Sequence, residues 1–418
     1  MRDRRGLWGH ADFLRLWSAQ AISAFGSRIT RTALPIIAVV SLGEPESIVG
    51  ALVALQLAPG VLLALVAGGF VDRGRKRRIL IGADVVRAIA VASLTVAWAL
   101  GALAVEHVIA VGCIVGAATS LFQIADIAYL PALIGAEQLV EGNSKLETTE
   151  AIAEITGPAS AGVLIAALGA PIAVAIDALS YVWSAVMLGR IRTPDVRAAA
   201  SGAGTQGAHA GTDLRIGMRA VFHHPQVRPI VLALMVWSIA GGFFSSLYPV
   251  YCLRELHLSE SLFGVIIALG GVGALGGALI SRRLATAIGT GPTLILTSAL
   301  SLLSLLFIPL ARGSSPLDLT YLGAQQLFGD GFAVAFVIQA TSLRQTVLPH
   351  EVLGRANAAI LACTAGVLPV TALVAGSLAQ AIGTREAVWL GVTIGLAAPL
   401  FLLPLRRLRE PPRAVSAA

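Results

Sequence analysis

The sequence contains few charged, aromatic and cysteine residues for its length. Of its 418 residues, 13% are charged, 6% are aromatic and three are cysteine, whereas 56% are hydrophobic. An average soluble domain is about 25% charged, so this chain has too few polar groups to cover a water-exposed surface. The scarcity of cysteine excludes a disulfide framework, and the high apolar fraction excludes a disordered chain. A mean hydropathy of +0.82 indicates a protein whose solvent is the lipid bilayer.

The sequence also lacks the motifs of common catalytic, metal and nucleotide sites. Its cysteines lie in apolar runs without CxxC spacing, which is typical of packing residues. No P-loop, HExxH or nucleophile elbow is present, which excludes a pump driven by its own ATP hydrolysis. Gly271-Val-Gly273-Ala-Leu-Gly276 matches GxGxxG, but no acid occurs between Glu260 and Asp318, so a dinucleotide site is excluded. We therefore expect no enzyme, no cofactor and no metal site.

Twelve apolar runs are each long enough to cross a bilayer. Because lipid offers no partners for backbone polar groups, such runs are helical. The sequence thus predicts an all-α membrane protein with twelve transmembrane helices in two six-helix pseudo-repeats. The predicted helices are 13–42, 47–70, 79–101, 107–134, 145–168, 170–190, 228–252, 260–281, 291–311, 317–342, 355–381 and 386–405.

The same pattern predicts four segments along the chain. They are an N-terminal bundle (1–190), a cytoplasmic linker (191–227), a C-terminal bundle (228–405) and a cytoplasmic tail (406–418). Small and polar residues make the linker flexible, apart from an interfacial helix expected over Leu214–Phe222. The first apolar run has no small-residue cleavage site, so we expect a retained helix and not a removed signal peptide.

The net charge of +7 follows the predicted topology. With the N-terminus inside, the inner ends and loops hold 24 of the 30 Lys and Arg residues, and the outer loops hold three. This asymmetry predicts that both termini lie in the cytoplasm. Nucleic-acid binding is excluded, because the positive charge is spread over several loops without an aromatic platform.

Two motifs recur in both halves of the sequence. Gly68-x-x-x-Asp72-Arg73 closes the second run, and Gly277-x-x-x-Ser281-Arg282 closes the eighth. Glu137-x-Leu139-x-x-x-Asn143 follows the fourth run, and Glu351-x-Leu353-x-x-x-Asn357 follows the tenth. The interval between the two copies is nearly the same for both motifs. Matched spacing in two halves indicates a duplicated transporter fold.

The tract from Gly68 to Arg78 resembles the cytoplasmic loop motif of the major facilitator superfamily. Gly68, Asp72 and Arg73 match that motif, whereas Arg75 stands where the motif has its later glycine. A glycine lets two helices approach, and an acid at a helix end pairs with a basic residue or a helix terminus. The resemblance implies that Asp72 stabilises one state of an alternating-access cycle. For the basic run that includes Arg77 we favour a topology signal.

Gly157-Pro158-Ala-Ser-Ala161-Gly162 resembles the antiporter motif of exporters in that superfamily, with Ala161 in place of one glycine. A proline kinks its helix, and small residues let a neighbour approach. The motif favours export, although an ordinary kinked packing site explains it equally well.

Further phrases place the chain more narrowly. They include Phe13-Leu-Arg-Leu-Trp17, Asp177-Ala-Leu-Ser180 and Leu343-Arg-Gln-Thr-Val-Leu-Pro349. Together they resemble the drug-exporter branch that includes macrolide efflux proteins and the enterobactin exporter. The resemblance implies the fold over nearly the whole chain, but it does not transfer the substrate.

Charged side chains inside the predicted spans are candidates for function, because each costs several kcal/mol there. In this superfamily the first, fourth, seventh and tenth helices line the central cavity, which selects Arg28, Arg31, Asp126 and Asp330. A carboxylate in an apolar cavity binds a proton readily, so an Arg–Asp pair that breaks and re-forms could exchange a proton for a cationic substrate. A static buried pair is an equally good interpretation. Glu154, about 15 Å along its helix from the inner end, is a third candidate proton carrier.

Other intramembrane charges and polar groups complete the set. For Asp177 and the Asp84–Arg87 pair we favour a structural role, because their helices pack outside the cavity. Gln123, Trp237 and Gln326 offer the amides and aromatic surface that suit a bulky amphipathic compound.

The sequence therefore predicts a secondary active exporter in the inner or plasma membrane. Its partners would be a small hydrophobic or amphipathic substrate, a proton or other ion gradient and the bilayer, with the chain acting as a monomer. A siderophore or metabolite exporter of the same fold is the alternative. A transport-inactive scaffold is disfavoured by the intramembrane charges, and a membrane enzyme by the lack of a catalytic constellation.

Overall fold

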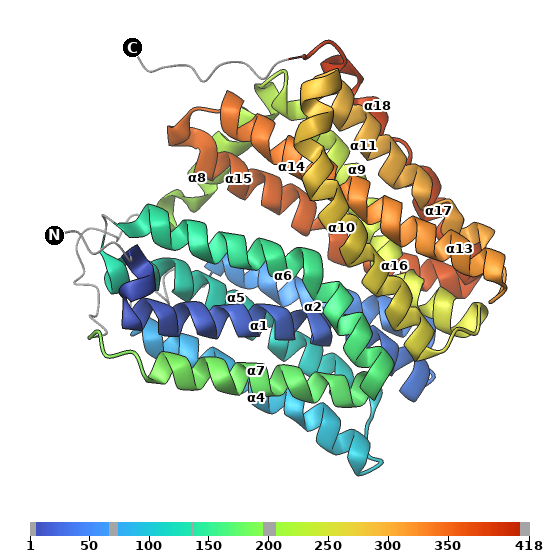
Figure 1. The fold of residues 1–418 in the computed structure, drawn as a ribbon, viewed down its shortest axis with the longest axis horizontal. Helices are drawn as coiled ribbons and strands as arrows, with labels where there is room; N and C mark the ends of the chain where they lie inside the picture. Colours follow the sequence, from blue (N-terminus) through green and yellow to red (C-terminus); the bar gives the residue numbers. More distant parts are fainter. Residues whose placement is uncertain (1–5, 67–73, 136–137, 195–205, 410–418) are drawn as a thin grey trace. The chain divides into compact units, whose positions relative to one another are not determined.

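The computed structural model describes residues 6–66, 74–135, 138–194 and 206–409, and these residues form helices and no strand (Figure 1). Their contacts divide the chain into two units. The first is Met1–Glu44 with Leu55–Gly207, and the second is Pro45–Ala54 with Ala208–Ala418.

The first unit is a helical bundle in which α7 packs against both α1 and α4. α1 contacts α6 and α7, whereas α4 contacts α5 and α7. Apolar side chains such as Phe13, Leu80 and Leu188 are fully buried where these helices meet. Its elements are η1 (Gly6–Gly9), α1 (Ala11–Ile36), η2 (Ile37–Ser41), most of α2 (Glu46–Val66), α4 (Lys76–Ala99), α5 (Val105–Ile134), α6 (Leu139–Leu168) and α7 (Ala170–Gly189).

The second unit repeats this packing pattern. α9 contacts α16 and α17, as α1 contacts α6 and α7, and α14 contacts α10 and α11. Its elements are α8 (Gln206–His223), α9 (Val227–Val250), η5 (Tyr251–Glu255), α10 (Glu260–Ile288), α11 (Thr290–Ser304), α12 (Phe307–Leu310), α13 (Pro316–Ala324), η6 (Gln325–Gly329), α14 (Asp330–Val347), α15 (His350–Ala365), α16 (Val367–Ile382), α17 (Thr384–Gly395), α18 (Ala398–Phe401) and η7 (Leu403–Leu405).

These elements fit the twelve predicted ranges when consecutive helices are joined, as α13, η6 and α14 are for 317–342. Eight described helices are long and apolar enough to cross a membrane, or nine if the bent helix α6 counts as one span. The predicted ends are within a few residues for most helices. The helix in the linker differs, since it begins at Gln206 and not at Leu214. Its end packs on α15, where a Cβ on Gly217 would lie 2.1 Å from the Arg355 carbonyl oxygen.

A proline precedes a π-helical turn at the same place in α1 and in α9. Pro35 lies near the end of α1 and is followed by the π-helix η2, and Pro249 lies near the end of α9 and is followed by the π-helix η5. The two prolines are separated by the same interval of sequence as Glu137 and Glu351. A proline removes one backbone hydrogen bond and crowds the carbonyl four residues earlier, so a wider turn follows at both sites.

Backbone conformation repeats at the interval that separates the two prolines. Gly43 (φ 69°) follows η2, and His257 (φ 54°) follows η5 at the equivalent position. Gly169 and Gly383, which are separated by the same interval, both have positive φ. His257 is the only non-glycine residue with positive φ in the part of the chain that the structure describes. The duplication indicated by the sequence therefore extends to individual backbone angles.

Candidate functional site

The two arginines of α1 meet the two glutamates of α6 in the first unit. Arg28 is only 6% exposed; its Nη2 lies 2.6 Å from Glu150 Oε1 and also pairs with Glu154. Arg31 Nη1 lies 4.0 Å from Glu154 Oε1. Both glutamate side chains are more than half exposed, so the cluster joins a buried cation to two accessible carboxylates. Two positive and two negative charges balance within it.

The predicted antiporter motif forms part of this cluster. α6 bends by 44° between Glu154 and Thr156. Pro158 accounts for the bend, because its ring crowds the carbonyl four residues earlier, which is that of Glu154. A Cβ on Gly157 would lie 2.5 Å from Arg28 Cγ, so the glycine makes room for the arginine. Gly162, one turn further along, belongs to the same helix.

Asp126 does not pair with an arginine, contrary to the Arg–Asp pairing expected from the sequence. Its Oδ1 accepts a hydrogen bond of 2.5 Å from Gln20 Nε2 of α1. Gln20 stands eight residues before Arg28, which is a different level of the helix. Gln123, one turn before Asp126 on α5, is exposed. Among the described residues, no basic group lies within ion-pair distance of Asp126.

Asp330 stands at the head of α14, directly after the π-helix η6. Single π-helical turns within α-helices are frequent at functional sites. A Cβ on Gly270 of α10 would lie 2.3 Å from Asp330 Oδ2 and 3.6 Å from Gln326 Nε2, so this glycine admits both side chains. Asp330 has no hydrogen bond or ion pair to another of the described residues. It is therefore an intramembrane acid without a compensating charge.

A cavity of about 100 Å³ opens beside Asp330 in the second unit. Its lining combines Trp237 and Phe244 of α9 with Ser301 of α11 and Gln325 of η6. Trp237 is held in place by stacking on Phe336, with ring centroids 4.9 Å apart. Drug-sized sites have about 300–1,000 Å³, so this cavity fits water or the polar end of a ligand.

Two amides beside Asp330 retain unused hydrogen-bonding capacity. Gln325 and Gln326 are 1% and 4% exposed, and the Oε1 atom of each has no partner. Buried polar atoms are normally paired. The acid and the two amide oxygens thus form a polar site that can accept hydrogen bonds from a ligand.

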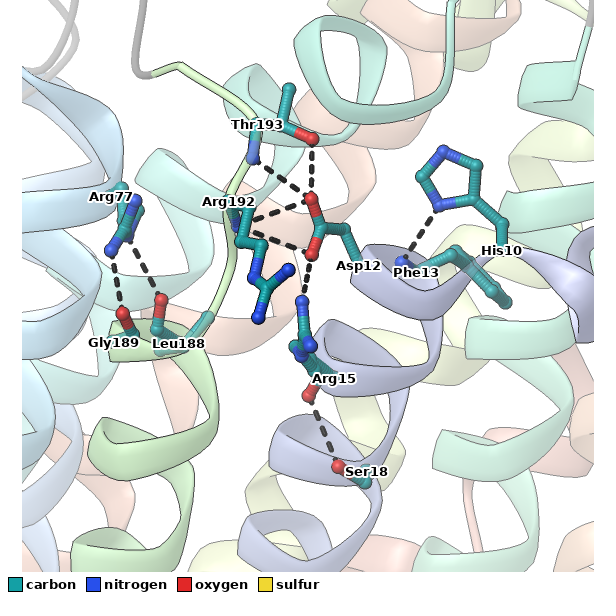
Figure 2. Close-up of polar contacts among 10 residues, drawn as sticks. All are labelled: His10, Asp12, Phe13, Arg15, Ser18, Arg77, Leu188, Gly189, Arg192 and Thr193. Carbon is teal, nitrogen blue, oxygen red and sulfur yellow. Dashed lines mark hydrogen bonds and ion pairs between the residues drawn. The ribbon is translucent and has the colours of Figure 1, made fainter.

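Figure 2 shows a second polar cluster at the start of α1, ahead of the predicted span 13–42. Asp12 accepts hydrogen bonds from the backbone N–H of Arg192 (3.1 Å) and of Thr193 (2.8 Å), and from the Thr193 hydroxyl (2.7 Å). It also pairs with Arg15. Burial raises the pKa of Asp12, but the bonds from Thr193, Arg192 and Arg15 outweigh it and lower the pKa to about 2.

Arg77 lies in the same region and binds the end of α7. Its Nε donates to the Leu188 carbonyl (2.9 Å) and its Nη2 to the Gly189 carbonyl (2.7 Å), as Figure 2 shows. A cation that bonds the last carbonyls of a helix also offsets the helix dipole. Arg77 is therefore a helix cap as well as a positive charge, which the sequence did not indicate. Gly68, Asp72 and Arg73 lie outside the described residues.

The structure thus brings some predicted residues together and separates others. Arg28, Arg31, Glu154 and Gly157 form one cluster. In the second unit Trp237 and Asp330 line one cavity, and Gln326 lies beside Asp330 at Gly270. The sequence marks Glu150 as an intramembrane acid, but it does not predict that Glu150 pairs with Arg28 or that Gln20 bonds to Asp126. The signal for Gln20 was present, because it stands two turns before Arg28 on one face of α1.

Two efflux proteins resemble this chain, one over most of its length and one over less than half of it. The Multidrug efflux pump Tap of Mycolicibacterium fortuitum is 28% identical over 374 residues, which covers 84% of this chain and 85% of that protein. The Macrolide efflux protein A of Streptococcus pyogenes is 28% identical over 182 residues, which covers 44% of this chain and 45% of that protein.

Solved structures share the fold at low identity. The nucleoside transporter NupG superposes with a TM-score of 0.73 at 12% identity, covering 95% of this chain and 99% of that one. A bacterial homologue of the iron transporter ferroportin, in its inward-facing state, gives a TM-score of 0.70 at 17% identity and covers 95% and 98%. The model of the Major Facilitator Superfamily matches residues 16–368. Together with the all-helical fold and its apolar spans, this match shows that the chain belongs to the Major Facilitator Superfamily and is a multi-pass membrane transporter.

Proposed function

We propose that this protein is a secondary active exporter of hydrophobic or amphipathic small molecules, driven by proton antiport through alternating access. Asp330 carries the proposal, because an acid without a compensating charge beside a cavity can hold a proton or a cationic group. Trp237 and Phe244 supply the aromatic surface for an amphipathic compound. The names of the two efflux relatives support export.

The clusters of the first unit supply the remaining parts of the mechanism. Glu154 can release Arg28 when it binds a proton, since Glu150 then remains as the partner of the arginine. Arg31, Gln123 and Asp126 would line the transport route. Gly157, Pro158 and Gly162 would let α6 change its bend, and Gly68, Asp72, Arg73 and Arg77 would stabilise one state of the cycle.

The proposed membrane topology follows the distribution of the basic residues. The exporter would lie in the inner or plasma membrane as a monomer with both termini in the cytoplasm, because basic residues favour the cytoplasmic side. Residues 1–190 and 228–405 would form the two moving bundles, joined by 191–227 and followed by the tail 406–418. The repeated backbone angles support two equivalent halves.

Accumulation of ethidium and of radiolabelled erythromycin tests the function in cells that express the full chain. We expect lower accumulation of at least one probe than in cells without the gene, and restoration by a protonophore. Unchanged accumulation over a broad panel of drugs would contradict drug export, and export of a catecholate siderophore alone would assign the metabolite class instead.

A triple variant tests the coupling ion. In Asp126→Asn/Glu154→Gln/Asp330→Asn every candidate proton carrier is neutral, so proton-driven efflux should be lost while the protein remains in the membrane. Efflux that continues unchanged would show that the coupling lies elsewhere.

A further inference from the structure

A buried group of charges lies in the first unit, apart from the residues assigned to transport above. Asp84 and Arg87 of α4 form an ion pair, and Asp177 of α7 lies next to them. Asp84 and Asp177 are 0% exposed and Arg87 is 3% exposed. The guanidinium carbon of Arg87 lies 4.3 Å from the ring centre of Tyr181 and 4.6 Å from that of Phe122. The arginine is thus fixed between two aromatic rings.

Asp177 is held by hydroxyl groups and not by an ion pair. Ser180 Oγ donates to Asp177 Oδ1 (3.0 Å), and the Thr30 hydroxyl of α1 donates to Oδ2. A Cβ on Gly26 would lie 2.5 Å from Asp177 Oδ1, so the backbone of α1 covers the carboxyl group closely. In the described ranges, the ion pair of Arg87 is with Asp84, and no basic nitrogen lies within 4.0 Å of Asp177.

The charges around this group do not balance when both acids are ionised. From α1, Arg28 and Arg31 face the glutamates of α6 and are neutralised there. α5 contributes a hydroxyl, that of Thr119 at 3.4 Å from Arg87 Nη1, and the ring of Phe122. Two carboxylates and one guanidinium leave one negative charge, and a buried charge without a partner costs several kcal/mol.

Polar atoms around the same three residues give a second, independent observation that points to a bound proton. Asp84 Oδ2, Arg87 Nε, Tyr181 OH and Ser184 Oγ are buried without a hydrogen bond of good geometry, although the Ser184 hydroxyl interacts with Asp84 and the Tyr181 hydroxyl with Asp177. A group of such atoms in a packed interior is unusual, because buried polar groups are nearly always satisfied. A proton on Asp177 removes the surplus charge and adds a donor that the Tyr181 hydroxyl oxygen can accept.

We propose that Asp84, Arg87 and Asp177 form a proton-binding site that holds one proton on Asp177 in the packed interior of the first unit. Asp84 remains ionised as the partner of Arg87. Loss of the proton would leave a negative charge between α1 and α7, so the site links protonation to the contact of these helices. It does not depend on the proposed export function or on its proton carriers.

Infrared spectroscopy of the full chain in lipid vesicles at neutral pH tests the site. The measurement uses the triple variant described above, in which the proposed transport acids are already neutral amides. A protonated carboxyl group gives a carbonyl stretching band that shifts in D2O and that ionised acids lack. We expect this background protein to retain the band of one buried carboxylic acid. Absence of the band would overturn the proposal.

Charge balance predicts a specific pattern when variants are added to this background. Asp177→Asn should lose the band. Asp84→Asn should also lose it, because Asp177 then ionises as the partner of Arg87. The double variant Asp84→Asn/Arg87→Gln should regain it, because Asp177 again has no cation.

If Asp84, Arg87 and Asp177 have only a structural role, the carbonyl band should not disappear in Asp84→Asn and return in the double variant. If Asp177→Asn fails to fold, the other two variants decide between the interpretations. A band that persists in Asp84→Asn, or that stays absent in the double variant, overturns the proposal.

Discussion

The two units carry charge inside the membrane in different ways. In the first, Arg28 is matched by Glu150 and Glu154, and Arg87 is matched by Asp84. In the second, Asp330 has amides, hydroxyls and aromatic rings around it and no cation among the described residues. Opposite charges let Glu150, Glu154 and Asp84 stay ionised beside their arginines, whereas Asp330 has no such partner and is stabilised by a proton or a bound cation. From this difference we assign exchangeable ion pairs to Arg28 and its glutamates in the first unit, and an exchangeable ligand to Asp330 in the second.

Neutralising Asp330 should have the largest effect on transport. In Asp330→Asn the side chain keeps its size but cannot carry a proton, so we expect proton-driven efflux of ethidium to fall by about tenfold or more. Asp330→Glu keeps the carboxyl group and should retain part of the activity. Vesicles with an imposed pH gradient provide the measurement. Equal activity of Asp330→Asn and the wild type would remove the distinction between the units.

A close glycine contact in the second unit gives the largest expected effect on stability. A Cβ on Gly277 would lie 1.8 Å from the Gly331 carbonyl oxygen, which is backbone, so Gly277→Ala must separate α10 from α14. We expect the free energy of unfolding to fall by about 3 kcal/mol. Gly276→Ala is the matched control, since nothing lies within 4 Å of its Cβ.

Gly157→Ala extends the same measurement to the first unit. Its Cβ would meet the flexible side chain of Arg28, so the cost should be nearer to about 1 kcal/mol. Thermal unfolding in detergent compares all three variants. Equal losses for Gly276→Ala and Gly277→Ala would refute the contact argument.

Asp12 shows how the first unit holds an ionised acid at the helix start, and it predicts a pH dependence. Its pKa of about 2 lies below the ordinary 3.8, so its ionised form stabilises the folded protein by about 2 kcal/mol above pH 4, and this is lost as the pH falls towards 2. Asp12→Asn should lower the melting temperature by a constant amount from about pH 5 to about pH 8, and the gap should close in acid. A gap that widens in acid would contradict the sign.

The sequence predicts the helices well and their side-chain partners poorly. Apolar runs must become helices in lipid, so most ranges agree with the structure. The same scarcity of charge selected Arg28, Glu154, Asp126 and Asp330 as candidates. Which of them meet depends on how each helix is rotated, and that is set by packing. For this reason Asp126 bonds to Gln20, and the π-helical turn before Asp330 has no counterpart in the apolar pattern.

Removing one ion pair of Arg28 should change the free energy of unfolding little, whereas removing both should lower it clearly. Either Glu150→Gln or Glu154→Gln leaves one carboxylate for the buried arginine, so each should cost less than about 0.5 kcal/mol, given the exposure of the glutamates. The double variant leaves the cation without a partner and should cost about 1–2 kcal/mol, more than the sum of the single changes. Thermal unfolding of the four proteins forms the cycle. Strictly additive losses would show that the two glutamates do not share Arg28.

His257 offers the finest comparison of the two units, because it adopts at φ 54° the conformation that Gly43 adopts at φ 69° in the equivalent turn. A left-handed conformation costs a residue with a Cβ about 1 kcal/mol, and glycine has no such cost. His257→Gly should therefore raise the free energy of unfolding by about 0.5 kcal/mol, since greater freedom of the unfolded chain offsets part of the gain. Gly43→His should lower it by a similar amount. Nothing lies within 4 Å of a Cβ on Gly43, so that loss would come from the backbone alone. If both changes destabilise the protein equally, His257 makes a contact that outweighs its strain, and the two turns are equivalent in shape but not in energy.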